Sequence, residues 1–119
     1  SRSVTDEYGG HERAGALPAA AVAGLPILLT ECGGIGFGRY SDSDFSYGDI
    51  PQSEAALEQR IRQITDMIDT AASLQGFVWT QLTDIQQEIN GLLYFDRTPK
   101  LPLPTLRTII TSVGRNLGD

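Results

Sequence analysis

The chain has 119 residues, 40% of them hydrophobic and 20% charged, which is the composition of one ordinary soluble domain. The formal net charge is -6 and the 9 Lys and Arg residues are scattered, which argues against nucleic acid as a partner. The sequence has no apolar stretch of bilayer length and no signal-peptide core at its start, so we expect no membrane partner, and the compartment stays open.

The first residues carry little pattern. Residues 1–15 are polar and glycine-containing and are predicted to be a flexible segment, which leaves residues 16–119 as the structured part. The only histidine, His11, falls in the flexible segment, so a histidine triad or a zinc site has no support. A short helix is predicted over residues 18–23, with Gly24 as its C-cap.

An apolar run over residues 25–31 follows and ends in a carboxylate. Its length and its β-branched residues predict a strand buried on both faces, as in a parallel sheet covered by helices, with Glu31 at the strand tip. A solvated acid at a strand exit is the plainer interpretation of Glu31. Gly33 and Gly34 favour a functional one, because they allow a tight turn or a close backbone approach.

A long polar loop, residues 33–52, separates this strand from the clearest helix of the chain. The loop contains Tyr40 and other aromatic residues, and loops of this length are often functional. The helix is predicted over residues 54–74 with Ser53 as its N-cap. Its apolar face is formed by Leu57, Ile61, Ile64, Ile68 and Ala71.

A second strand is predicted over residues 76–82, which makes a parallel strand-helix-strand unit with the first. A turn at Asn90-Gly91 and a last helix from about Pro104 to Gly114 complete the chain. Two parallel strands cannot bury both sheet faces and both edges. We therefore expect part of a larger α/β protein, completed by a missing region or by another copy of the chain.

Four side chains gather at the predicted strand ends. The carboxyl ends of neighbouring parallel strands share one edge, which brings together Glu31, Trp79, Gln81 and Asp84. Such an acidic and aromatic rim suits a sugar, because the ring stacks on the indole and the hydroxyl groups bond to amide and acid groups. The alternative for Trp79 is a packed sheet residue.

Other chemistries fit less well. The glycines at positions 33, 34, 36 and 38 lack the spacing of a dinucleotide-binding loop. Cys32 has no basic partner and is expected to pack rather than to react. Glu31 and Asp84 could share a metal ion, but the spacing of a calcium loop is missing, so neither a metal nor a cofactor is predicted.

Four motifs in order resemble a known family. They are residues 26–34, 76–84, 90–92 and 96–100, and together they resemble the end of the catalytic (β/α)8 barrel of glycoside hydrolase family 2. That family includes β-galactosidases, β-glucuronidases and β-mannosidases. The resemblance covers roughly residues 24–113 and implies that the two strands are the seventh and eighth of a TIM barrel.

The resemblance also implies roles for single residues. Glu31 matches the catalytic nucleophile, and Trp79 matches a tryptophan beside the substrate subsite, with Gln81, Asp84 and Tyr40 as further substrate-binding candidates. In related barrels the peptide bond after that tryptophan is often cis, so the bond from Trp79 to Thr80 is predicted to be cis. Cys32 departs from the family, where an aromatic residue is more common.

A second departure concerns the catalytic partner. Retaining glycosidases need two carboxyl groups about 5 Å apart, and in this family the acid/base Glu follows an Asn. The chain has no Asn-Glu dipeptide. We expect the whole protein to hydrolyse terminal β-linked sugars through a glycosyl-Glu31 intermediate, and the isolated chain to be inactive. The alternative is a non-catalytic module that binds carbohydrate or a partner chain, and the sequence does not identify the sugar.

Overall fold

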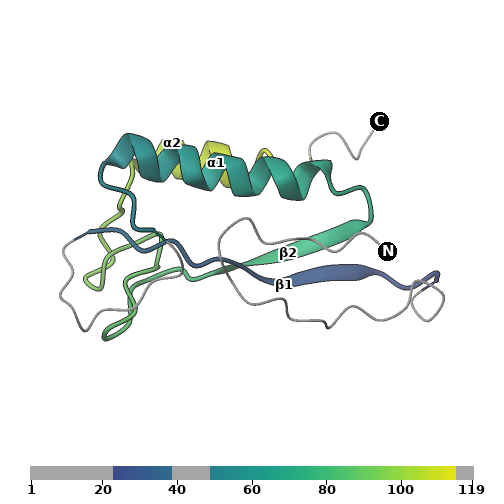
Figure 1. The fold of residues 1–119 in the computed structure, drawn as a ribbon, viewed down its shortest axis with the longest axis horizontal. Coiled ribbons are helices and arrows are strands. Elements are labelled where there is room, and N and C mark those ends of the chain that lie inside the picture. The colour runs from purple at the N-terminus through teal and green to yellow at the C-terminus, as the bar shows by residue number, and fades with distance from the viewer. Residues whose placement is uncertain (1–22, 39–48, 115–119) are drawn as a thin grey trace.

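The computed structural model describes residues 23–38 and 49–114, which form a mixed α/β unit. Its elements are β1 (Ile27–Gly33), α1 (Glu54–Thr70), β2 (Leu74–Thr80) and α2 (Leu103–Ile110). The two helices lie together on one side of the two-stranded sheet (Figure 1). The α/β class predicted from the sequence is confirmed. The expected flexible segment over residues 1–15, residues 18–22 of the short helix predicted over 18–23, and Tyr40 lie outside the described residues.

The sheet has the predicted parallel pairing. Leu29 pairs with Phe77 and Cys32 with Trp79, with an irregular register between these two pairs. Pairing continues beyond the predicted strand end, because Gly33 pairs with Thr80 and the Gly34 N–H donates to the Thr80 carbonyl at 2.7 Å. Glu31 is therefore the fifth of seven strand residues rather than the tip.

Helix α1 begins where the sequence predicts and ends earlier. The Ser53 hydroxyl accepts a hydrogen bond from the Ala56 N–H at 3.1 Å, which satisfies one free donor of the first turn. The predicted end at residue 74 is wrong, because Ala71 leaves helical geometry and its carbonyl accepts from the Leu74 N–H at 2.9 Å. Leu74 instead begins β2, so a tight turn connects the helix directly to the strand.

The buried face of α1 contains one polar residue that the periodic pattern does not reveal. Thr65 is only 1% exposed, and its hydroxyl donates to the Ile61 carbonyl at 3.1 Å. Burial of a threonine costs little free energy when its hydroxyl donates a hydrogen bond to a carbonyl of the preceding helical turn. Thr65 therefore joins Leu57, Ile61 and Ile68 on the face that packs inward.

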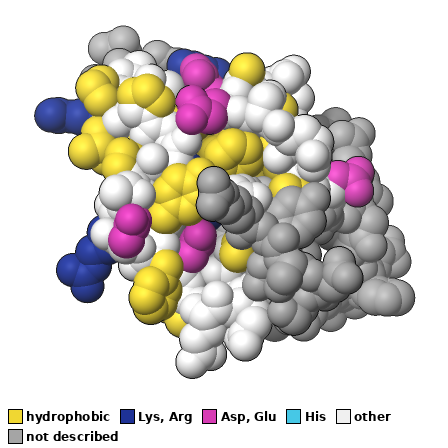
Figure 2. All heavy atoms as spheres, turned by 90° about the vertical axis from the view of Figure 1, so that its left-hand side faces the viewer, with side chains coloured by type: hydrophobic (Ala, Val, Ile, Leu, Met, Phe, Trp, Pro, Cys, Tyr) yellow, Lys and Arg dark blue, Asp and Glu magenta, His cyan; other side chains and the backbone are white. Residues whose placement is uncertain are grey.

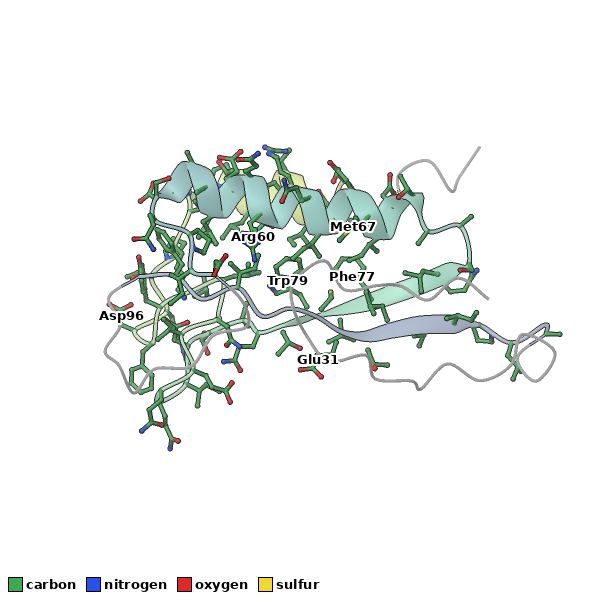
Figure 3. The ribbon with its side chains drawn as sticks, in the orientation of Figure 1. Glu31, Arg60, Met67, Phe77, Trp79 and Asp96 are labelled. Carbon is green, nitrogen blue, oxygen red and sulfur yellow. The ribbon has the colours of Figure 1, made fainter. Side chains whose placement is uncertain are left out.

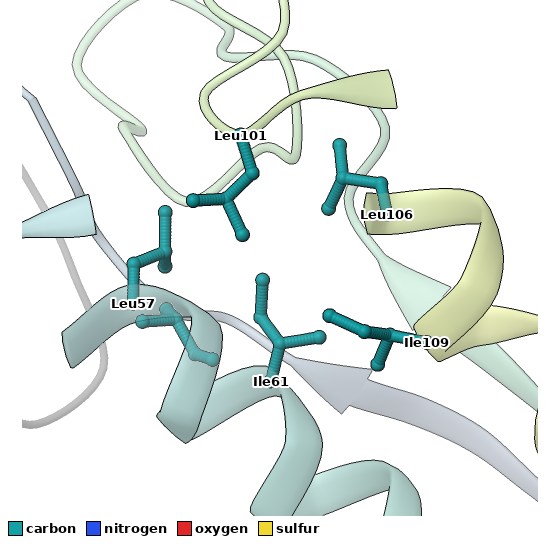
Figure 4. Close-up of a cluster of buried hydrophobic side chains, with 6 residues drawn as sticks. Leu57, Ile61, Leu101, Leu106 and Ile109 are labelled. Atoms are coloured by element: carbon teal, nitrogen blue, oxygen red, sulfur yellow. The ribbon is translucent and has the colours of Figure 1, made fainter. Parts of the chain in front are cut away.

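The hydrophobic core lies between the two helices and the chain segments that follow the strands. Its centre contains side chains of both helices (Figure 4), and Trp79 packs against its edge. The buried cluster consists of Ile35, Leu57, Ile61, Leu101, Leu106 and Ile109. The core thus belongs to the side of the sheet that faces the helices.

The opposite side of the sheet is uncovered in the described part of the chain. Leu28 is 57% exposed and Val78 is 56% exposed. The prediction that β1 is buried on both faces is therefore wrong, since Leu28 is exposed and both helices pack on the same side of the sheet. Helix α2 also ends before the predicted residue 114, at Ile110. In the described residues, no helix combines the length and apolarity needed to cross a membrane.

Candidate functional site

Glu31 lies near the carboxyl end of β1 and is exposed to solvent. Its side chain points away from α1, on the side of the sheet that the helices leave open (Figure 3). Two glycines with positive φ follow, Gly33 at 98° and Gly34 at 66°. A side chain at Gly33 would also clash with Trp79, since its Cβ would lie 2.6 Å from the indole Cε2. The glycine thus lets the strand end approach the indole closely.

Trp79 lies on the other side of the sheet. Figure 3 shows its ring between the sheet and α1, where it packs against the core. Strand side chains alternate between faces, so Phe77 and Trp79 share the helix side whereas Val78 points to the open side. The structure therefore does not bring Glu31 and Trp79 together on one face, and a substrate contact by Trp79 stays a prediction.

The Trp79 indole lines a small cavity of about 10 Å³. Its Nε1–H is buried and finds no hydrogen-bond acceptor among the described residues, and the same holds for Nδ2 of Asn90, which lines the same cavity. These two donors belong to the protein interior rather than to an open substrate subsite, and the packed-residue alternative for Trp79 gains support.

Gln81 lies directly after β2 and is half-buried. Its amide Nε2 donates to Asn90 Oδ1 at 2.7 Å and to Glu88 Oε2 at 3.3 Å. The peptide bond between Thr80 and Gln81 is cis, so the predicted position, one bond earlier, is wrong. Gln81 is held in a defined orientation by the loop that follows it, and its contact with substrate stays a prediction.

Asp84 is buried and forms an ion pair that the sequence does not reveal. Its Oδ1 accepts from Lys100 Nζ at 2.7 Å and from the Gly91 N–H at 2.8 Å. The Lys100 ammonium also donates to the Ile89 carbonyl at 2.7 Å. Burial lowers the pKa of Lys100, and the hydrogen bond to Asp84 opposes that shift. Asp84 thus has a structural part in the loop, and its proposed contact with a sugar stays a prediction.

Gly91 completes the same loop. A Cβ at this position would lie 2.4 Å from the Asp84 backbone nitrogen, so only glycine fits there. The close approach allows the Gly91 N–H to reach the Asp84 carboxylate. The Asn90-Gly91 dipeptide, which marks a turn in the sequence, therefore also serves the buried ion pair.

Cys32 follows Glu31 in the chain but differs from it chemically. It is half-buried, and its thiol donates to the Val78 carbonyl at 3.3 Å. Burial raises the pKa of Cys32 to about 11, which keeps it a neutral thiol near pH 7. This agrees with the expected packing role.

The end of the molecule beyond the strands is both apolar and acidic. Figure 2 shows hydrophobic side chains exposed there beside Asp and Glu side chains. The exposed apolar residues of the loop after β2 include Leu82, Ile85 and Phe95. Among the residues that the structure describes, no group of three or more His, Cys, Asp or Glu side chains could hold a metal ion.

Comparison with known proteins adds no family to this description. No family model matches the sequence, and no curated protein matches it closely enough to count as a relative. The site is therefore interpreted from its own residues and geometry.

Proposed function

We propose that this chain forms strands seven and eight of a glycoside hydrolase barrel and contributes the nucleophile of a retaining enzyme that acts on terminal β-linked sugars, as a β-galactosidase does. The observation that carries the proposal is the position of Glu31, exposed near the carboxyl end of a parallel strand and turned away from the helices. In (β/α)8 barrels the helices lie outside, and the catalytic residues lie at the carboxyl ends of the strands.

The proposed chemistry uses Glu31 twice. Its carboxylate attacks the anomeric carbon, so that an ester bond to the sugar forms while the bond to the leaving oxygen breaks. A water molecule then attacks the same carbon, and the Glu31 carboxylate is released with the configuration retained. Both steps need a second carboxyl group, first as acid and then as base, about 5 Å from Glu31. We propose that a part of the protein outside this sequence supplies that group.

Completion of the barrel would also change the open face of the sheet. Further strands would cover Leu28 and Val78, which are exposed in the described chain. They would also pair with the outer edges of β1 and β2, beside which the described residues form no further strand. The same requirement supports the expectation that the chain acts with the remainder of a barrel or with another copy of itself.

A non-catalytic binding module is the alternative, and one observation favours it. Trp79 packs toward the core instead of beside Glu31, so these two residues do not combine an aromatic platform and an acid on one face. In that case the exposed sheet face would bind a carbohydrate or a partner chain without reaction.

The two proposals differ in the effect of Glu31→Gln in the complete protein that carries this sequence. If Glu31 is the nucleophile, hydrolysis of an aryl β-glycoside falls by about 10³-fold or more, because the amide cannot form the intermediate. Glu58→Gln on the outer side of α1 is the matched control and should leave kcat unchanged. Full activity of Glu31→Gln would remove the nucleophile assignment.

A further inference from the structure

Lys100 is buried inside the loop that follows β2, which comprises residues 81–101. It is 2% exposed, and its ammonium donates to Asp84 Oδ1 and to the Ile89 carbonyl. It also lies 5.4 Å from the centre of the Tyr94 ring, within the range of a cation–π interaction. A buried ammonium needs such partners, because an uncompensated charge in the protein interior is strongly unfavourable.

Two of these groups also contact the segment that follows β1, residues 34–38. The Ile89 carbonyl accepts a hydrogen bond from the Phe37 N–H at 3.1 Å. The Tyr94 ring fits against Gly38, where a Cβ would lie 2.7 Å from its Cε1. The Ile89 carbonyl and the Tyr94 ring therefore lie between the Lys100 ammonium and the segment that follows β1, and contact both.

We propose that the ion pair of Asp84 and Lys100 is a clamp that positions the segment leaving β1, and through it the strand end that carries Glu31. Lys100, held by Asp84, fixes the Ile89 carbonyl and the Tyr94 ring relative to the loop, and these two groups contact Phe37 and Gly38. Lys100 is thus a positioning residue. Its consequence for Glu31 rests on the proposed function, whereas the clamp itself does not.

Hydrogen exchange of single amides tests the clamp in the 119-residue chain. In Lys100→Met the Phe37 amide should exchange about tenfold faster or more, because the Ile89 carbonyl loses the group that fixes it. Amides in the middle of α1, such as that of Ile64, should change less. Arg62→Met removes an exposed ion pair with Glu58 and is the control, with Phe37 exchange unchanged.

Three results would overturn the clamp. The first is equal acceleration of the Phe37 and α1 amides in Lys100→Met, which indicates general loss of stability. The second is a Phe37 amide that is unprotected in the unaltered chain, and the third is a Phe37 amide that keeps its exchange rate in the variant. If Lys100→Met fails to fold, the double variant Asp84→Asn with Lys100→Met removes both charges, and the same selective acceleration of Phe37 is expected from it.

A second measurement separates the clamp from the glycosidase proposal. In the complete protein, an activated 2-fluoro-β-glycoside should esterify Glu31 about tenfold more slowly in Lys100→Met, with its Kd unchanged. Equal labelling rates with faster Phe37 exchange would overturn the positioning of Glu31. If the unaltered protein takes no label on Glu31, the proposed function is overturned, and the exchange result alone decides the clamp.

Discussion

The two sides of the β1–β2 sheet differ in what covers them. The helix side carries the buried cluster, in which Ile61 and Ile109 are each 1% exposed. The open side carries Leu28, Val78 and the exposed Glu31. The described chain builds its core on one side of the sheet, and Glu31, the proposed nucleophile, projects from the other.

The largest expected effect lies on the helix side. Ile61→Ala should lower the free energy of unfolding by about 3 kcal/mol, because it leaves a cavity in the buried cluster. Urea denaturation measures the change. Met67→Ala in the same helix, where the side chain is 54% exposed, is the control and should lower the free energy of unfolding by less than about 1 kcal/mol. Equal losses would contradict the position of the core.

The reactivity of Cys32 tests whether its side chain is half-buried while that of the neighbouring Glu31 is exposed to solvent. Its pKa of about 11, against an ordinary value of 9.0, leaves about 100-fold less thiolate near pH 8. Alkylation by iodoacetamide should therefore be about 100-fold slower in the folded chain than in urea. A rate equal to that of the unfolded chain would show that Cys32 is open to water.

Ser53→Ala tests how the covering helix begins. Loss of the hydroxyl that accepts from the Ala56 N–H should lower the free energy of unfolding by about 1 kcal/mol. Thermal unfolding followed by circular dichroism measures the shift. Ser73→Ala, in the exposed turn before β2, provides the matched substitution without a helix cap. Equal melting temperatures of the two variants would contradict the role of Ser53 as the helix cap.

The smallest effect is expected on the open side. Val78→Thr keeps the branched shape and replaces a methyl group that is largely in water, so the free energy of unfolding should change by less than about 0.5 kcal/mol. The same denaturation experiment applies. A loss above 1 kcal/mol would mean that this face is covered in solution, for instance by a second copy of the chain.

The sequence predicts the order of elements well, because that order depends on local signals. The periodic apolar residues of α1, its cap at Ser53 and the apolar runs of both strands are all visible without a structure. The early end of α1 is not, since Leu74 satisfies the helix pattern equally well and pairs with β1 instead. Tertiary pairing overrides helix periodicity there.

The site was predictable only in part. The apolar run and the glycines single out Glu31, but which side of the sheet Trp79 occupies depends on the register of the strands and on the side that the helices cover. The ion pair of Asp84 with Lys100 could not be predicted from the sequence, for another reason. Lys100 lies 16 residues away in a polar run that looks like a surface turn, and only the fold brings its ammonium inside.

Trapping of the proposed intermediate tests the central claim most directly. The complete protein would be treated with a 2-fluoro-β-glycoside that carries a dinitrophenyl leaving group, which needs no protonation to depart. Mass spectrometry of a peptic digest should then find one added fluorosugar, attached as an ester to Glu31, and none in Glu31→Gln. Rapid turnover with the sugar attached to another carboxylate would contradict the account.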